Sequence, residues 1–246
     1  MKTVAIIPSR FKSSRFPGKP LADILGKPMV WHVYKAAKSV REIDEVYVAT
    51  DDDRIEAICD TLGMKCLRTS DQHFTGTDRL TECLGLVDGD CFVNVQGDEP
   101  MIEPGAIAAV ARAMINCKDR DVVATNGYTL IENAEDITSA NVVKVILTRS
   151  GRALSYSRLP IPYSRGESPP YKRQLGLYCF TRRGLELFAS LKPGPVERSE
   201  SVEMLRFVEH DHAVLMVEVE DRSVPVDTKE DLLRVRELMM GGKGRR

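Results

Sequence analysis

The sequence predicts an α/β fold in which a mostly parallel central sheet is flanked by helices and carries a β-rich inserted region. Two observations predict it. Short apolar runs alternate with helix-like runs through residues 1–125, as in chains of βαβ units. Beyond residue 126, strand-like runs follow one another without intervening helices. A chain of 246 residues fits one domain, 1–246, with the β-rich insertion at about 127–182.

The first half supplies the alternating elements. Pro28 suits the first turn of a helix, residues 51–53 can cap the next one, and Gly63 suits its end. The predicted strands are Thr3–Pro8, Glu45–Thr50, Lys65–Arg68, Cys91–Gln96 and Asp121–Thr125. The predicted helices are 28–40, 53–62, Asp78–Leu86 and Gly105–Asn116, the last begun by Pro104.

The second half begins with strands and ends with helices. Four prolines make Leu159–Tyr171 irregular, and we expect this β-rich region to serve self-association. Thr228 with Asp231 is a capping-box pattern that predicts a last helix, Lys229–Met239. The other predicted strands are Val142–Thr148, Ala153–Ser157, Leu175–Phe180, Ala213–Val219 and Ser223–Val226, and the other helices are Arg183–Ser190 and Ser199–His210.

Composition indicates an ordinary cytoplasmic globule. The formal net charge of −1 gives no global field for binding nucleic acid or a membrane surface. No apolar run approaches the length of a membrane span, and an apolar strand directly after the first residues argues against a signal peptide. The six cysteines form no C-x-x-C pair, so they are expected to be reduced thiols rather than zinc ligands.

A cationic loop follows the first predicted strand. It carries Arg10, Lys12, Arg15 and Lys19. Ligands of open α/β sheets bind at the carboxyl ends of strands, and Arg and Lys pair with phosphate oxygens. The loop matches neither the Walker pattern nor the G-x-G-x-x-G fingerprint. Taken alone it is either a solvated basic loop or a polyphosphate site, and its position favours the second.

Two aspartates stand at the ends of predicted strands. Asp98 follows the strand Cys91–Gln96, and Asp227 follows Ser223–Val226. Mg²⁺ commonly uses one or two carboxylates together with substrate phosphates. The less favoured alternatives are a turn residue for Asp98 and a helix cap for Asp227, and neither carboxylate alone predicts a metal site. Their combination with the cationic loop predicts a magnesium–triphosphate site.

Seven motifs in order give the chain a resemblance to a known family. It resembles the cytidylyltransferases that activate 3-deoxy-manno-octulosonate (Kdo), the CMP-Kdo synthetases, from residue 4 to about 239. The motifs are Ile7-Pro8-Ser9-Arg10 with 14–21 (SRFPGKPL), 26–29 (GKPM), 49–52 (ATDD), 76–79 (GTDR), 94–100 (NVQGDEP), 157–162 (SRLPIP) and 226–228 (VDT).

The resemblance implies a Rossmann-like nucleotidyltransferase fold and transfer of CMP from CTP to Kdo, with release of pyrophosphate. It further implies Mg²⁺, a homodimer and a role in lipopolysaccharide synthesis. Its motifs assign catalytic roles to Arg10, Arg15 and Lys19, and magnesium binding to Asp98 and Asp227. They assign CTP binding to Ser9, Arg10, Arg15, Lys19, Thr77, Asp78, Arg79 and Gln96, and sugar binding to Arg158, Gln174, Tyr178 and Glu203.

Two positions depart from the family pattern, both on the sugar side. Gln174 stands where members typically have His, and Met204 where they typically have Gln. Replacing a polar contact by Met removes a hydrogen-bonding group that a substrate hydroxyl can require. The change is either tolerated drift or adaptation to a modified acid, such as an amino-substituted octulosonate.

The sequence fits three other functions less well. A cytidylyltransferase for nonulosonic acids fits the Ser14–Pro17 loop less well, and sugar 1-phosphate nucleotidyltransferases commonly have a Gly-rich loop that is absent from this sequence. A non-catalytic nucleotide-sugar sensor is a further alternative, but a sensor need not retain every phosphate-binding and metal-binding residue.

Overall fold

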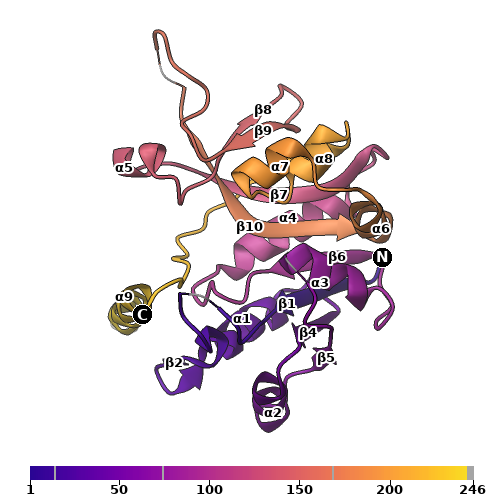
Figure 1. The fold of residues 1–246 in the computed structure, drawn as a ribbon, viewed down its shortest axis with the longest axis vertical. Helices are drawn as coiled ribbons and strands as arrows, with labels where there is room; N and C mark the ends of the chain where they lie inside the picture. Colours follow the sequence, from indigo (N-terminus) through magenta and orange to yellow (C-terminus); the bar gives the residue numbers. More distant parts are fainter. Residues whose placement is uncertain (14, 74, 168, 243–246) are drawn as a thin grey trace.

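The computed structural model describes residues 1–13, 15–73, 75–167 and 169–242, and within these ranges the chain forms one large mixed sheet with helices on both faces (Figure 1). The order of the main strands is β11-β7-β10-β6-β1-β4-β5, with β8 pairing with β10 and β9. Their bounds are β1 Thr3–Pro8, β4 Glu45–Thr50, β5 Cys66–Arg68, β6 Cys91–Val95, β7 Val122–Leu130, β8 Lys144–Leu147, β9 Ala153–Ser157, β10 Lys172–Thr181 and β11 Ala213–Glu218.

Along the main strand order, four of the six neighbouring pairs are parallel, which confirms the predicted fold class. Strand β1 runs parallel to β4 and β6, β4 to β5, and β7 to β11. The exception is β10, which runs antiparallel between β6 and β7. Residues 172–181, which fall within the predicted β-rich insertion, therefore lie in the middle of the main sheet.

Side chains alternate between two apolar layers. In β1, Ala5 and Ile7 face one cluster while Val4 and Ile6 face the other, all with 0% exposure, because successive residues of a strand point to opposite faces. The first layer is closed by α1 (Met29–Lys38), α2 (Asp53–Thr61) and α4 (Pro104–Ile115), and the second by α3 (Gly76–Cys83), α6 (Arg182–Ser190) and α8 (Leu205–Glu209).

A third, smaller cluster fixes the C-terminal segment against the N-terminal part of the chain. Val226 and two residues of α9 (Lys229–Gly242), Leu232 and Val235, pack on Ile24 and Met29. Ile24 belongs to the hairpin formed by β2 (Asp23–Ile24) and β3 (Lys27–Pro28), and Met29 is the first residue of α1. Figure 1 shows α9 beside this N-terminal region, away from the sheet. The packing places Asp227 near the cationic loop.

Two predicted elements were wrong. The single helix expected at 199–210 is two helices, α7 (Pro195–Glu200) and α8, separated by Ser201 in the left-handed conformation with φ 52°. This conformation cannot continue a helix of L-residues. The strand expected at 223–226 is an irregular segment, whose Val226 N donates a hydrogen bond to the backbone oxygen of Asp98 at 2.8 Å.

The hairpin of β8 and β9 extends from the sheet, and the loop after β9 projects beyond it (Figure 1). The short helix α5 (Ala134–Thr138) lies in the connection from β7 to β8. Among the described helices, none is both long and apolar enough to cross a bilayer.

The contact between α6 and β7 gives a test of the packing. A Cβ added to Gly184 of α6 would lie 2.1 Å from the backbone oxygen of Val123. Backbone cannot yield as a flexible side chain does, so we expect Gly184→Ala to lower the free energy of unfolding by about 3 kcal/mol. Urea denaturation measures this.

The matched control is Gly105→Ala, in the exposed start of α4, where an added Cβ meets nothing within 4 Å. This change should leave stability unchanged or raise it by up to about 1 kcal/mol. Equal stability of the two variants would contradict the packing described.

Candidate active site

The ammonium group of Lys19 joins three distant segments of the chain. Its Nζ lies 2.7 Å from Asp98 Oδ2, 3.1 Å from Asp227 Oδ1 and 2.9 Å from the backbone oxygen of Val226. Arg15 approaches the second oxygen of Asp227 at 3.0 Å. The structure thus brings Lys19 and Arg15 of the cationic loop together with both predicted carboxylates, Asp98 and Asp227.

Local backbone geometry produces this convergence. Lys19 opens a 3-10 turn, Lys19–Leu21, directly after Gly18, whose φ is 73°. Asp98 follows Gly97, where an added Cβ would lie 2.8 Å from the backbone oxygen of Pro8. Only glycine lets the chain after β6 pass this close to the end of β1, and the Val226 N to Asp98 O hydrogen bond ties the third segment to the same place.

These groups line a polar cavity of about 330 Å³ at the carboxyl edge of the sheet. Arg10, Arg15 and Lys19 form its cationic wall, and Asp98 and Asp227 lie at the same end. The remaining lining residues are Pro8, Ser9, Ser13, Pro20, His73, Thr75, Gly76, Arg79, Gln96 and Gly97. Of the predicted nucleotide-binding residues, Thr77 and Asp78 are outside this lining.

The donor set at the cationic end suits a divalent cation. Asp98 and Asp227 offer hard carboxylate oxygens, and both already contact one positive charge, the Lys19 ammonium. Two carboxylates that share a cation and face a phosphate-binding wall match the ligands Mg²⁺ prefers. These two aspartates would hold the metal.

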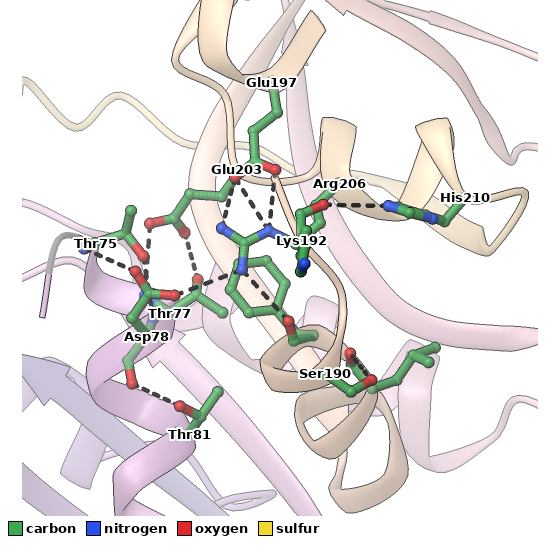
Figure 2. Close-up of polar contacts among 12 residues, drawn as sticks. Thr75, Thr77, Asp78, Thr81, Ser190, Lys192, Glu197, Glu203, Arg206 and His210 are labelled. Carbon is green, nitrogen blue, oxygen red and sulfur yellow. Dashed lines mark hydrogen bonds and ion pairs between the residues drawn. The ribbon is translucent and has the colours of Figure 1, made fainter. Parts of the chain in front are cut away.

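A second cavity, of about 1050 Å³, adjoins the first. Arg10, His73, Thr75 and Gly76 line both. Its far wall comes from α7, α8 and the end of α6, and Figure 2 shows Glu203 and Asp78 there facing one another across Thr75 and Thr77. A ligand spanning both cavities would pass Arg10.

Glu203 is joined to the start of α3. Its carboxylate accepts hydrogen bonds from Thr77 Oγ1 and, at 3.5 Å, from Thr77 N. Burial raises the pKa of this carboxyl, and the hydrogen bonds from Thr77 and Thr75 oppose that rise. The group predicted to face the sugar therefore lies on the second cavity and is braced by a nucleotide-motif residue.

A buried ion pair supports this wall (Figure 2). The guanidinium of Arg206 donates to both carboxylate oxygens of Glu197, at 2.7 to 3.1 Å, and lies 3.8 Å from the Phe188 ring centroid. It also lies 3.6 Å from Asp78 Oδ1. The Asp78 carboxylate accepts from Thr75 N in a capping box at the start of α3, so Asp78 acts here as a cap that links α3 to α8.

Comparison with known proteins decides the family. A cytidylyltransferase family model matches residues 4–218. The chain is 43% identical to a 3-deoxy-manno-octulosonate cytidylyltransferase of Syntrophus aciditrophicus over 98% of each chain. It is similar to a solved CMP:2-keto-3-deoxy-manno-octonic acid synthetase complexed with CTP, with TM-score 0.93, 38% identity and 98% and 100% of the two chains covered.

The chain belongs to the 3-deoxy-manno-octulosonate cytidylyltransferase family. It is a nucleotidyltransferase enzyme. It is also 39% identical to an 8-amino-3,8-dideoxy-manno-octulosonate cytidylyltransferase of a Shewanella species, over 98% of this chain and 100% of that relative. Relatives named for two related acids are thus similar to it at nearly equal identity.

The two departures of this cytidylyltransferase from the family pattern lie in different surroundings. Met204 is fully buried in the core layer beneath α8 and is not among the described residues that line the second cavity. Gln174 donates through Nε2 to Tyr178 Oη at 2.8 Å, and Tyr178 is itself buried. Substitution by Met at 204 therefore changes packing, while Gln174 retains a polar contact.

Two further predicted residues are held by neighbouring protein groups. Arg158 donates to the backbone oxygens of Ala140, Glu200 and Ser201 and lies outside the lining of both cavities. Arg79 donates to Thr69 Oγ1 and to Asp51 Oδ1 at 2.5 and 2.8 Å, yet still lines the first cavity.

Two residues in or near the site, His73 and Asn126, were not singled out by the sequence patterns. His73 lines both cavities and contacts Glu82. Asn126 is fully buried, and its Nδ2 donates to Leu175 O and Leu177 O where the β10–β7 pairing shifts register. Neither belongs to a motif, and a single His or Asn carries no spacing from which its partner is predictable.

Glu99, next to Asp98, gives the cytidylyltransferase a pH-dependent stability. Burial, with the charges of Asp98 and Asp221, raises the pKa of Glu99 to about 7, although Ser223 Oγ donates to it at 2.9 Å. At a pH between the pKa of Glu99 in the unfolded chain and its pKa in the folded chain, the unfolded chain has lost the carboxyl proton of Glu99 while the folded chain still holds it. The contribution of Glu99 to stability is therefore lost as pH rises from about 4.5 to 7.

We expect Glu99→Gln to remove this loss. In metal-free buffer the variant should match the parent near pH 5 and exceed its free energy of unfolding by up to about 3 kcal/mol at pH 8. Urea denaturation across this pH range measures the difference. A stability difference that does not change with pH would contradict the assignment.

Proposed function

We propose that this enzyme transfers CMP from CTP to the anomeric hydroxyl of 3-deoxy-manno-octulosonate, or of a close variant such as the 8-amino acid, and releases pyrophosphate. The observation that carries the proposal is the Lys19 ammonium between Asp98 and Asp227 in a cavity that opens into a second one at Arg10. The names of the similar cytidylyltransferases support the choice of acid.

Cationic side chains of this protein would stabilise the negative charge that develops during the reaction. Arg10, Arg15 and Lys19 would bind the triphosphate, and the negative charge that builds on the pyrophosphate leaving group would be stabilised by these fixed cations more than the ground state is. Lys19 is 15% exposed and already oriented by two carboxylates, so little reorganisation is needed. Mg²⁺ held by Asp98 and Asp227 would supply further positive charge to the phosphates.

The second cavity would hold the sugar acid so that its hydroxyl points at the α-phosphorus. Glu203, braced by Thr77, would accept hydrogen bonds from sugar hydroxyls, and Arg10, at the border of the two cavities, would pair with the acid's carboxylate. Holding the two substrates in this orientation lowers the barrier by removing the cost of bringing them together.

We also propose an oligomeric state and a cellular location for this enzyme. Apolar side chains are exposed around β9 and the following loop, with Leu154 56%, Leu159 71% and Tyr163 86% exposed, which supports a homodimer formed through this region. Sedimentation equilibrium should give twice the 27.5 kDa chain mass, and a single-chain mass would contradict the homodimer.

We further propose that the activation of this acid serves lipopolysaccharide synthesis in the cytoplasm. The free cysteines of the described residues are in keeping with a reducing compartment.

Lys19→Ala tests the cationic wall. The change removes the charge at the leaving group and leaves Asp98 and Asp227 without their shared partner, so we expect kcat to fall about 100- to 1000-fold. Pyrophosphate release from CTP with the sugar acid measures this. Lys38→Ala, at the exposed end of α1, is the matched control and should keep full activity. Near-normal turnover by Lys19→Ala would remove Lys19 from the mechanism.

Asp98→Asn tests the proposed metal site. An amide is a weaker ligand for Mg²⁺ than a carboxylate, so the variant should need at least about tenfold more Mg²⁺ for half-maximal rate. Titration of activity against Mg²⁺ measures this, with Asp88→Asn, an exposed surface change, as the control. An unchanged Mg²⁺ requirement would exclude Asp98 as a ligand.

A substrate panel tests the choice of acid. Pyrophosphate release is measured with CTP, Mg²⁺ and, in turn, 3-deoxy-manno-octulosonate, its 8-amino variant and a nonulosonic acid. We expect kcat/KM to be at least about 100-fold higher for one of the octulosonates than for the nonulosonic acid. A preference for the nonulosonic acid, or no release with any acid, would overturn the proposed function.

A further inference from the structure

His73 lies where the two cavities meet, and one carboxylate holds its imidazole. The ring's Nε2 is 2.5 Å from Glu82 Oε2, and the side chain is 17% exposed. Glu82 Oε2 also accepts a hydrogen bond from the backbone N of Ser70 at 2.8 Å. Glu82 belongs to α3, so helix, loop and ring form one fixed unit at the cavity wall.

This contact determines which ring nitrogen carries the proton. Burial raises the pKa of Glu82, but hydrogen bonds from His73 and from the backbone of Ser70 outweigh that effect and hold the pKa below its ordinary value. Glu82 is therefore ionised at neutral pH and has no proton to donate. In the neutral ring the proton lies on Nε2, and Nδ1 carries a lone pair and accepts hydrogen bonds.

The lining of the first cavity combines His73 with the triphosphate anchors. His73 and Thr75 come from the loop that leads back from β5 to α3, and Gly76, the first residue of α3, lies against Pro8 and Gln96 at the ends of β1 and β6. The triphosphate anchors Lys19, Asp98 and Asp227 contact one another in the same lining. A nucleoside triphosphate anchored there extends its base toward His73 and Arg79, which line the same cavity.

The chemistry of the two pyrimidines makes an acceptor at this position selective. Cytosine presents an amino group at C4, a hydrogen-bond donor, whereas uracil presents a carbonyl oxygen there, an acceptor. We propose that His73 selects cytosine over uracil by accepting a hydrogen bond from the C4 amino group at Nδ1, and that Glu82 is the positioning residue that fixes the required tautomer. This inference rests on the proposed function, because it takes the triphosphate to bind as described there.

The decisive measurement is the ratio of kcat/KM for CTP to that for UTP. His73→Phe keeps a flat ring but removes the acceptor, so we expect the ratio to fall about 10- to 100-fold. Glu82→Gln offers either an oxygen or an amide N–H to Nε2, so it no longer fixes the tautomer, and we expect the ratio to fall by a smaller factor, about threefold to tenfold.

The matched control is His212→Phe. His212 packs edge-on against Phe207 and is not among the described residues that line either cavity, so its replacement should leave the ratio unchanged. An unchanged ratio in folded His73→Phe would overturn the inference. So would an equal loss of rate with both nucleotides, which would make His73 a proton acceptor in the reaction rather than a selector of the base.

Two measurements keep the test decisive. If thermal melting shows that His73→Phe does not fold, the ratio for Glu82→Gln decides: a fall supports the inference and an unchanged ratio overturns it. Calorimetric binding of CTP and UTP without any sugar acid separates this inference from the proposed function. A wild-type preference for CTP that His73→Phe loses supports the role of His73 even if no acid of the panel is activated.

Discussion

The ion pairs of Lys19 with Asp98 and Asp227 are the interaction on which the site depends. They join segments 79 and 208 residues apart in the sequence. Each carboxylate sits beside the ammonium, so removal of the cation would leave two negative groups facing one another. The glycine at 97 and the packing of α9 on the β2–β3 hairpin serve the same geometry, because one allows Asp98 to approach β1 and the other holds Asp227 in place.

The site is built as two connected cavities with different mechanical support. The first is lined by chain segments that leave the ends of parallel strands, where backbone position is fixed by the sheet. The second is lined by α7 and α8, whose position relative to α3 rests on Arg206, Glu197 and Asp78. The nucleotide side is therefore set by the sheet, and the acid side by side-chain contacts between helices.

Much of this was predictable from local patterns, and the remainder depended on long-range geometry. The alternation of apolar runs predicted β1, β4, β5, β6 and β7, and the positions of Lys19 in the loop after β1 and of Asp98 after β6 predicted that they converge. Asp227 joins them as predicted, although the segment before it is irregular rather than the expected strand. The central place of β10 was not predictable, because pairing partners leave no trace in a strand's own residues. The left-handed Ser201 that divides α7 from α8, and the single residues His73 and Asn126, likewise lacked any repeating or spaced signal.

The antiparallel strand between β6 and β7 has a consequence for how the chain folds. During synthesis β6 and β7 are both complete at Leu130, well before β10 begins at Lys172, so their facing edges stay unpaired for that interval. Sheet closure must wait for residue 181, and loop entropy makes such late, distant pairing slow. The growing chain therefore exposes two apolar strand edges to other nascent proteins, and a chaperone that shields them would raise the yield of native enzyme.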